Sequence, residues 1–365
     1  GHHLSSPGAM DMNAPPPPST PKRARASATP ADYQEELLTL STGLAVPTYW
    51  WHPPQEHLTP VSELSSAAVL CLHGAGDCAL CWAQVARKLL RDQRLGGNAI
   101  VSADLRGHGR HACFGHEPLD ESLRLERLLP DMLALVKCIS DRVEGEGLIL
   151  CGHSLGGAVA ARAAQEAMKM KPPLPVRAVV LLESVEGTAT EALPKSIAWM
   201  QARPQSFGSL EDAIAWSLSS GMLTNPQAAR ENVPPRLIHQ EVNGEESWSW
   251  ITDVSKATRC LSHCFEGLSE LFVALPLPKL LVVGAVDRMD ATLEAAHMQG
   301  RFRLEVVPHP GHYIHEDRPE EVAEAIAKFL LQLKQQEAAY AKIMECRASP
   351  SSSRSPSANP KRQKT

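Results

Sequence analysis

Six short, nearly continuous apolar runs lie in this sequence, and they constrain its fold more than any other feature. They are residues 67–72, 99–103, 147–151, 176–182, 279–283 and 303–307. A strand with one solvated face alternates apolar and polar residues, whereas a strand buried on both faces is apolar throughout. Longer segments of helical character separate the runs. The pattern therefore predicts an α/β fold, with a mostly parallel central sheet and helices on both faces.

Composition divides the 365 residues into a body and two tails. Residues 1–30 include four consecutive prolines and few apolar side chains, and residues 347–365 are rich in Ser, Pro and basic residues. Such segments bury too little apolar surface to offset their ordering entropy, so we predict that both are disordered. The body, residues 31–346, has a suitable length for one α/β domain with an insertion.

The alternation of strands and helices is interrupted between about residues 188 and 262. Helix-like segments surround Trp199, Ala213–Ser217 and Trp250. Ser209 is followed three residues later by Asp212, a spacing that is typical of a helix start. We predict a helical cap inserted between two strands of the sheet.

Charge is unevenly distributed along the chain. Of the formal net charge of −5, residues 1–30 carry +2 and residues 347–365 carry +5, which leaves −12 on the body. An acidic body does not favour nucleic-acid binding, which needs clustered basic residues. Separately, no apolar run approaches the ~20 residues that a helix needs to cross a membrane. The basic clusters Lys22–Arg25 and Lys361–Lys364 fit either nuclear import signals or solvated tail charge. We expect a cytoplasmic protein, with nuclear entry as an open alternative.

The nine cysteines form an odd, scattered set without the spacing of a disulfide framework. The pairs Cys78/Cys81 and Cys260/Cys264 have spacings that zinc ligands can share, but each pair fits a helical pattern without metal. We predict reduced thiols and no metal site.

The strongest chemical signal is the pentapeptide Gly152-His-Ser-Leu-Gly156, which lies between an apolar run and a helix-like segment. A sharp strand-to-helix turn needs small residues on both sides, so that the backbone folds tightly and Ser154 is held out at the tip. Ser154 is therefore the predicted nucleophile.

A second loop, His73–Gly76, follows the first apolar run. Its small residues allow a backbone N–H to face a developing oxyanion, and we predict the N–H groups of Ala75 and Leu155 as the two donors. A third loop begins at Asp104. There we predict a structural role, with Asp104 and Arg106 as local hydrogen-bonding groups.

A histidine is the expected general base, because its pKa lies near neutral pH. His312 follows the last apolar run and precedes an amphipathic helix, which places it at the carboxyl edge of the sheet with Ser154. His309 and His315 are the rivals, and His315 fits a packing or capping role better.

Two carboxylates are candidates for the acid that orients the histidine. Glu183 ends the run 176–182, and Asp287 follows the run 279–283. Either one satisfies the order Ser, acid, His, and Asp287 occupies the commoner position in hydrolases of this sheet type.

These segments together resemble the protein phosphatase methylesterase family of α/β hydrolases over about residues 60–330. Val185-Glu-Gly-Thr-Ala189 is the most particular of the matching segments. The others are His73–Gly76 with Trp82, Asp104–Arg106, Gly152–Ala158, Arg203-Pro204 with Ser209-Leu210, Phe265–Ser269, Val286–Arg288, Met298–Gly300, and Gly311-His312 with His315–Asp317.

The resemblance implies a serine esterase that demethylates the C-terminal leucine of the protein phosphatase 2A catalytic subunit through an acyl-enzyme, without a cofactor. It places the nucleophile at Ser154, the base at His312 and the acid at Glu183, where the family has aspartate. The extra methylene displaces the carboxylate by about 1.5 Å, so either the backbone retracts or Asp287 takes over. Glu186 contacts substrate or braces the cap.

Two other functions stay open at this stage. One is an esterase that acts on small-molecule esters or lipids, since fold and triad determine the reaction class but not the substrate. The other is a non-catalytic phosphatase-binding protein, suggested by the altered acid position. We expect a monomer in each case.

Overall fold

The computed structural model describes residues 22–23, 32–52, 67–95, 98–113, 118–143, 147–242, 244–254 and 257–348. Apart from Lys22–Arg23 and residues 347–348, the two predicted tails lie outside these described residues, as does the basic cluster Lys361–Lys364. Among the described helices, none combines the length and apolar composition that crossing a membrane requires.

An eight-stranded sheet forms the centre of the body, in the order β12-β11-β7-β6-β4-β5-β3-β2. The strands are β2 (Gln34–Thr39), β3 (Ala45–Trp51), β4 (Ala68–Leu72), β5 (Ile100–Ala103), β6 (Leu148–His153), β7 (Val176–Leu182), β11 (Lys279–Val283) and β12 (Arg303–Val306). Strands β12, β11, β7, β6, β4 and β5 pair parallel with their neighbours in that order, while β3 pairs antiparallel with both β2 and β5. All six apolar runs form parallel strands, so the predicted fold class is confirmed.

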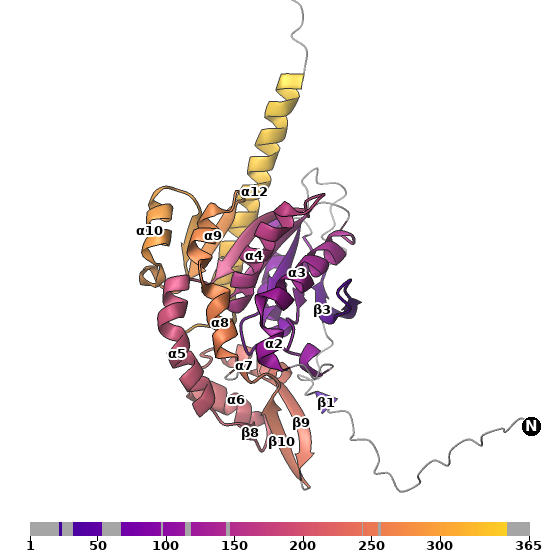
Figure 1. Cartoon of the computed structure of the whole chain (residues 1–365), viewed down its shortest axis with the longest axis vertical. Helices are drawn as coiled ribbons and strands as arrows, with labels where there is room; N and C mark the ends of the chain where they lie inside the picture. Colours follow the sequence, from indigo (N-terminus) through magenta and orange to yellow (C-terminus); the bar gives the residue numbers. More distant parts are fainter. Residues whose placement is uncertain are drawn as a thin grey trace, which may run out of the picture.

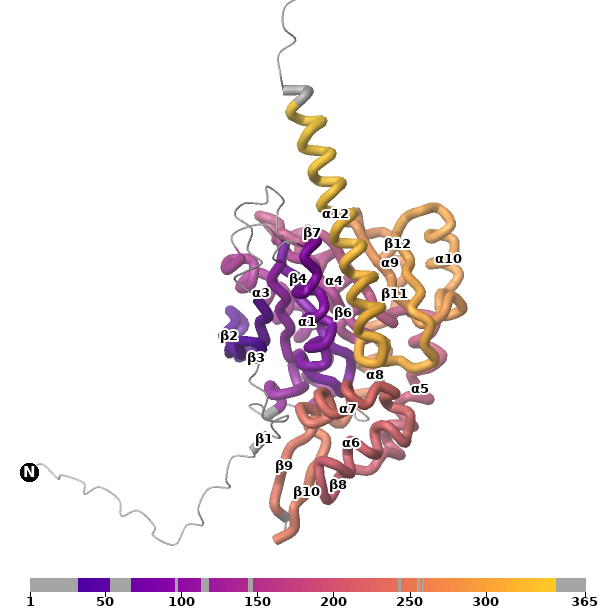
Figure 2. The backbone as a smooth tube through the Cα atoms, turned by 180° about the vertical axis from the view of Figure 1, so that it is seen from behind, coloured from indigo at the N-terminus to yellow at the C-terminus, as the bar shows by residue number. Residues whose placement is uncertain are grey.

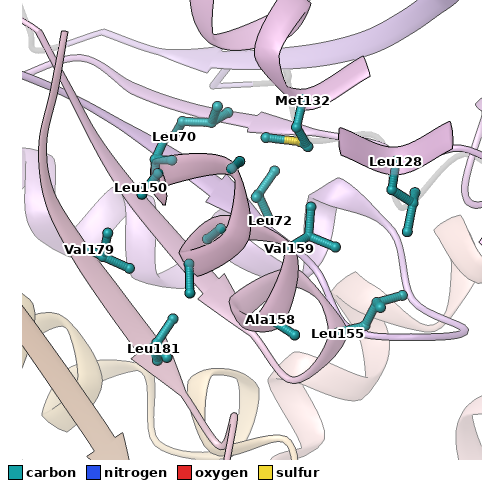
Figure 3. Packing of buried hydrophobic residues seen from close by; sticks show 14 of the residues in the cluster. Leu70, Leu72, Leu128, Met132, Leu150, Leu155, Ala158, Val159, Val179 and Leu181 are labelled. Carbon is teal, nitrogen blue, oxygen red and sulfur yellow. The ribbon is translucent and has the colours of Figure 1, made fainter. Parts of the chain in front are cut away.

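Side chains that alternate along each central strand pack on opposite faces of the sheet, and helices cover both faces. On one face, Leu70, Leu150 and Leu181 pack against α3 (Leu125–Ser140) and α4 (Leu155–Lys169), as Figure 3 shows. On the other face, Val69, Ile149 and Val180 belong to a second core. It includes side chains of α1 (Ala83–Arg91) and α12 (Pro319–Ala348), which lie together in Figure 2.

The other described helices of the body are shorter than these four. They are α2 (Leu119–Ser122), α8 (Thr258–Phe265), α9 (Leu268–Ala274), α10 (Ala291–Met298) and α11 (Ile314–Asp317). The last helix, α12, continues well past the sheet, and its final turns extend away from the body in Figures 1 and 2.

The cap contains both helices and a small sheet, which corrects the prediction of a helical cap. Its helices are α5 (Glu186–Ala202), α6 (Leu210–Ser219) and α7 (Pro226–Asn232). Strands β8 (Ser206–Phe207), β9 (Leu237–Val242) and β10 (Glu245–Trp250) pair antiparallel beside them (Figure 1), and β1 (Lys22–Arg23) adds to β9.

The segment around Trp250 was wrongly predicted as helix. Residues 247–250 read Ser-Trp-Ser-Trp, which has the two-residue period of a strand. The Trp250 ring packs on Phe207 of β8 at a centroid distance of 5.7 Å. The predicted helix start at Ser209 is confirmed, because its hydroxyl accepts a hydrogen bond from the Asp212 N–H at 3.1 Å.

Candidate active site

Ser154 stands at the turn between β6 and α4, with backbone angles φ 51° and ψ −119°. This region is unfavourable for residues with a Cβ and costs about 1–3 kcal/mol. Three glycines make the turn possible. A Cβ on Gly152 would lie 2.3 Å from the Gly156 carbonyl carbon, one on Gly156 would lie 2.4 Å from the Leu72 oxygen, and one on Gly157 would lie 2.0 Å from Ser184 Oγ. The pentapeptide therefore forms a sharp turn with the serine at its tip.

The neighbouring strand holds this turn in place. The Ser154 N–H donates to the Leu182 carbonyl at 2.9 Å, and Ser184 Oγ donates to the Ser154 carbonyl at 2.7 Å. The Ser154 side chain stays partly exposed. The backbone of Ser154 is thus fixed, while the residue remains partly open to solvent.

The loop at the end of β4 passes directly against Ser154. A Cβ on Gly74 would lie 3.3 Å from the Ser154 Cβ and 2.8 Å from His153 Nδ1, so only glycine fits there. Ala75 follows in this loop, and Leu155 is the first residue of α4, where backbone N–H groups have no partner within the helix. The two predicted oxyanion donors therefore belong to segments next to the serine, and their role stays a prediction.

His312 lies in the loop that follows β12, beside the end of β6. His153 Nε2 donates to the His312 carbonyl at 2.9 Å, and the two rings have a centroid distance of 4.7 Å. The His312 side chain is 50% exposed. The structure therefore places Ser154 and His312 at the same edge, although it records no hydrogen bond between these two described side chains.

Glu183 is the predicted acid that lies beside His312. Its Oε2 is 3.8 Å from His312 Nδ1, and its Oε1 accepts a hydrogen bond from the Gly284 N–H at 2.6 Å. The carboxylate is almost completely buried, and the Glu183 backbone has a positive φ of 51°. Asp287 is exposed in the short turn Val286–Arg288 and forms no described ion pair with His312. The geometry thus favours Glu183 over Asp287.

Arg288 is a site residue to which the sequence assigned no role. Its Nη1 pairs with Glu183 Oε2, the same oxygen that faces His312. Desolvation by surrounding protein atoms and the Arg288 charge both lower the pKa of His312 below its usual value of 6.5. His312 therefore stays neutral, as a general base must, in mildly acidic solution.

The two rival histidines have structural surroundings. His309 Nε2 lies 2.8 Å from Asp317 Oδ2, and both side chains are buried. His315 is buried in α11 against the rings of Trp82 and His153. Neither side chain is open to a substrate in the way that His312 is.

A buried ion-pair network joins the cap to two segments of the body that adjoin the site. Arg236 of the cap bonds Asp77 Oδ1 through Nε at 2.8 Å and Glu316 Oε1 through Nη2 at 2.5 Å. All three side chains are at most 1% exposed. Sequence analysis missed this network, because its members are 80 and 159 residues away from Arg236.

The other predicted groups act locally. Glu186 accepts hydrogen bonds from the N–H groups of Gly267 and Ser269, at 2.7 and 3.3 Å, so it braces the N-terminus of α9. Asp104 accepts from the Ala79 N–H at 2.7 Å, and Arg106 pairs with Asp131 at 2.7 Å, which confirms their structural role.

One described group has the residue types of a metal site. The ligand atoms of Asp77, Cys81 and His315 lie within 4.8 Å of one another, and all three residues are buried. Arg236 already pairs with Asp77, and its positive charge opposes a cation at this position. We assign no metal to the group. None of the four cysteines of the pairs Cys78/Cys81 and Cys260/Cys264 forms a disulfide bond.

Comparisons with known proteins agree on the fold. Residues 69–325 match the model of the alpha/beta hydrolase family. Among solved structures, E-2-(acetamidomethylene)succinate hydrolase superposes with a TM-score of 0.62 at 20% identity, over 82% of this chain and 99% of that one. An esterase of Mycobacterium tuberculosis superposes with a TM-score of 0.56 at 21% identity, over 83% of this chain and 93% of that one.

The relatives found by sequence identify the family more narrowly than the solved structures do. The probable protein phosphatase methylesterase 1 of Caenorhabditis elegans is 36% identical over 258 residues, which are 71% of this chain and 67% of the relative. Protein phosphatase methylesterase 1 of Schizosaccharomyces pombe is 36% identical over 70% of this chain and 72% of its own. The protein of the same name from Mus musculus is 32% identical over 72% of this chain and 75% of its own.

Proposed function

The chain belongs to the protein phosphatase methylesterase family of α/β hydrolases, and from this membership we propose that it demethylates the C-terminal leucine of the protein phosphatase 2A catalytic subunit. Its family and fold make it a carboxylic ester hydrolase. The names of the relatives point to a protein phosphatase as the protein acted on, and the leucine methyl ester follows from the resemblance of the sequence motifs.

One observation carries the catalytic part of the proposal. Ser154 is held at the tip of a strained turn, and His312, whose Nδ1 is 3.8 Å from Glu183 Oε2, lies at the same edge of the sheet. A nucleophile, a base and an orienting acid in this arrangement support acyl transfer. All three come from one chain, so we expect a monomer to be sufficient.

The reaction begins when Ser154 Oγ attacks the ester carbonyl carbon and His312 Nε2 accepts the hydroxyl proton. The N–H groups of Ala75 and Leu155 stabilise the oxyanion of the tetrahedral intermediate. The intermediate collapses when the bond to the methoxy oxygen breaks. His312 donates its proton to that oxygen, and methanol leaves an ester between Ser154 and the leucine.

Hydrolysis of the acyl-enzyme repeats these steps with water. His312 removes a proton from water, the hydroxide attacks the carbonyl, and the proton returns to Ser154 Oγ. The leucine carboxylate is released. Because Ser154 and His312 are not hydrogen-bonded in the structure, their contact has to shorten when substrate binds, and longer contacts are common in free enzymes.

Demethylation of the intact, methylated phosphatase subunit tests the proposal. The proteins to compare are wild type, Ser154→Ala and Ser219→Ala, the last of which changes an exposed serine at the end of α6. We expect Ser154→Ala to lose at least about a thousandfold in kcat/KM, because it lacks the nucleophile. Ser219→Ala should match wild type.

p-Nitrophenyl acetate serves as a second substrate in the same experiment. If wild type hydrolyses this ester but leaves the methylated phosphatase untouched, the protein is an esterase of small molecules instead. If Ser154→Ala demethylates the phosphatase at the wild-type rate, the assigned nucleophile is wrong. Folded wild type that is inactive on both substrates contradicts the proposal as a whole.

A further inference from the structure

Arg288 occupies an unusual position between the predicted acid and the predicted base. It ends the short turn Val286–Arg288 after β11, and its side chain is 19% exposed. Its Nη1 pairs with Glu183 Oε2. The same guanidinium therefore bonds the oxygen that has to accept the hydrogen bond of the His312 Nδ1–H group.

The other bonds of Arg288 go to the backbone that leads into His312. Its Nη2 donates to the carbonyls of His309 at 3.1 Å, Pro310 at 3.0 Å and Gly311 at 3.3 Å, and Nη1 also reaches the Gly311 carbonyl at 3.3 Å. One planar group thus joins three consecutive carbonyls to one carboxylate. A lysine ammonium cannot reproduce this geometry, because it is a point charge without a fixed fork of donors.

Few other described bonds locate this loop relative to Glu183. The His309 N–H donates to the Gly284 carbonyl at 3.2 Å, and His153 holds the His312 carbonyl from the opposite side. Gly284 itself binds Glu183 Oε1. Arg288 is the side chain that contacts both Glu183 and the carbonyls preceding His312, so it links the position of the base to that of the acid.

We propose that Arg288 is a positioning residue of the active site, which fixes the loop before His312 against Glu183. This inference rests on the proposed function, because it assigns Arg288 a role only if His312 acts as the base. Glu183 has one methylene more than the aspartate implied by the family resemblance, and its Oε2 is shared between Arg288 and His312. The guanidinium therefore determines how closely the imidazole approaches that oxygen.

The charge effect has a definite sign. A guanidinium beside the imidazole disfavours the imidazolium, and Glu183 opposes this effect. The groups that face His312 come from five elements and the loop itself: Glu183 after β7, Arg288 after β11, Asp77 after β4, His153 in β6, His315 in α11, and the adjacent Tyr313. Removing the Arg288 charge leaves Glu183 free to stabilise the imidazolium, so the acid limb of activity should move to higher pH.

The test compares Arg288→Met, Arg288→Lys and the control Arg303→Met, whose guanidinium pairs with Glu305 on β12. The measurement is kcat/KM for p-nitrophenyl acetate between about pH 4.5 and 8, because histidine side chains ordinarily titrate within this range. For Arg288→Met we expect a loss of about 30-fold at the optimum, together with an acid limb shifted upward by about one pH unit. Arg288→Lys should lose about tenfold without that shift, because the charge remains. Arg303→Met should behave as wild type.

Two results overturn the inference: folded Arg288→Met with wild-type kcat/KM, or Arg288→Met whose activity falls while its acid limb stays in place. The second result would mark Arg288 as structural only. Thermal unfolding confirms that each variant is folded, and Arg288→Gln replaces Arg288→Met if the latter does not fold. Labelling of wild-type Ser154 by a fluorophosphonate separates failure of this inference from failure of the proposed function. Folded wild type that is not labelled contradicts the proposed function itself and not merely the role of Arg288.

Discussion

Glu183 has the most consequential surroundings of any single residue in the site. Its carboxylate is buried, accepts a hydrogen bond from Gly284 and faces His312 Nδ1 at 3.8 Å. Replacing it by Gln keeps the volume but removes the charge that stabilises the imidazolium during attack. We expect Glu183→Gln to lower kcat for a simple ester by about a thousandfold, measured near pH 7.5, with the protein still folded.

Asp287→Asn is the matched control for this substitution. Asp287 lies in the neighbouring loop, is exposed and forms no described contact with His312, so its charge should change kcat by less than about twofold. A large loss with Asp287→Asn and none with Glu183→Gln would move the acid to Asp287 and contradict the geometry.

Residues whose chemistry depends on local sequence were predictable, and those that depend on distant partners were not. Ser154 and His312 stand out because a short motif and a strand end mark them. The choice between Glu183 and Asp287 depends on where two strands place their following residues. The role of Arg288 depends on the same meeting of separate loops, so no local pattern reveals it.

At the scale of elements, the junction of β6 and α4 depends on close backbone contact. A Cβ on Gly156 would meet the Leu72 carbonyl oxygen at 2.4 Å, and that oxygen belongs to β4 and cannot rotate away. Helix α4 has to shift, so we expect Gly156→Ala to lower the free energy of unfolding by about 3 kcal/mol in urea denaturation. The shift also displaces Ser154, so esterase activity should fall.

Gly208→Ala provides the comparison for that measurement. A Cβ there has one neighbour, Asp212 Oδ2, at an ordinary distance of 3.8 Å. Its free energy of unfolding should stay within about 0.5 kcal/mol of wild type. Equal stability of the two variants would show that the turn tolerates a side chain at Gly156.

The parallel strands were predictable as elements because each is a continuous apolar run buried on both faces. The cap strands were not, since β10 is half-exposed and its Trp residues suit a helix or a strand equally in isolation. Its pairing with β8 and β9 decides the outcome, and pairing is a tertiary property. Strand β2 was missed for a related reason, because it lies at the edge of the sheet and its mostly exposed residues form no continuous apolar run.

At the scale of the molecule, the Arg236 network attaches the cap to the loops that carry the site. Arg236 belongs to the cap, Asp77 follows the predicted oxyanion loop, and Glu316 lies four residues after His312. Arg236→Met would leave two carboxylates buried without their partner. We expect it to lower the free energy of unfolding by about 3–5 kcal/mol in urea denaturation.

A triple variant tests the cause of that loss. Combining Arg236→Met with Asp77→Asn and Glu316→Gln removes the unpaired charges, and buried ion pairs are often replaceable by neutral groups at little cost. The triple variant should recover about half of the loss or more. If it is as unstable as Arg236→Met, packing and not charge explains the effect.

The whole molecule should also be sensitive to mild acid, because several imidazoles are buried as neutral groups. Burial lowers the pKa of His73 to about 4 and that of His108 and His315 to about 3, from 6.5. The unfolded chain binds these protons near pH 6.5 and the folded chain does not, so stability is complete above pH 6.5 and falls as the pH is lowered. Each histidine should remove about 1 kcal/mol per pH unit between roughly pH 6 and 5.

Urea denaturation at a series of pH values measures this dependence, and His108→Gln isolates one contribution. Its amide can still donate to the Arg106 carbonyl, which His108 Nδ1 approaches at 3.0 Å. The slope of stability against pH should therefore decrease by about 1 kcal/mol per pH unit in this variant. His297→Gln is the matched control, because that exposed ring on α10 is solvated whether the chain is folded or unfolded. An unchanged slope in His108→Gln would mean that the buried ring takes up its proton without unfolding, and that water reaches the loop after β5.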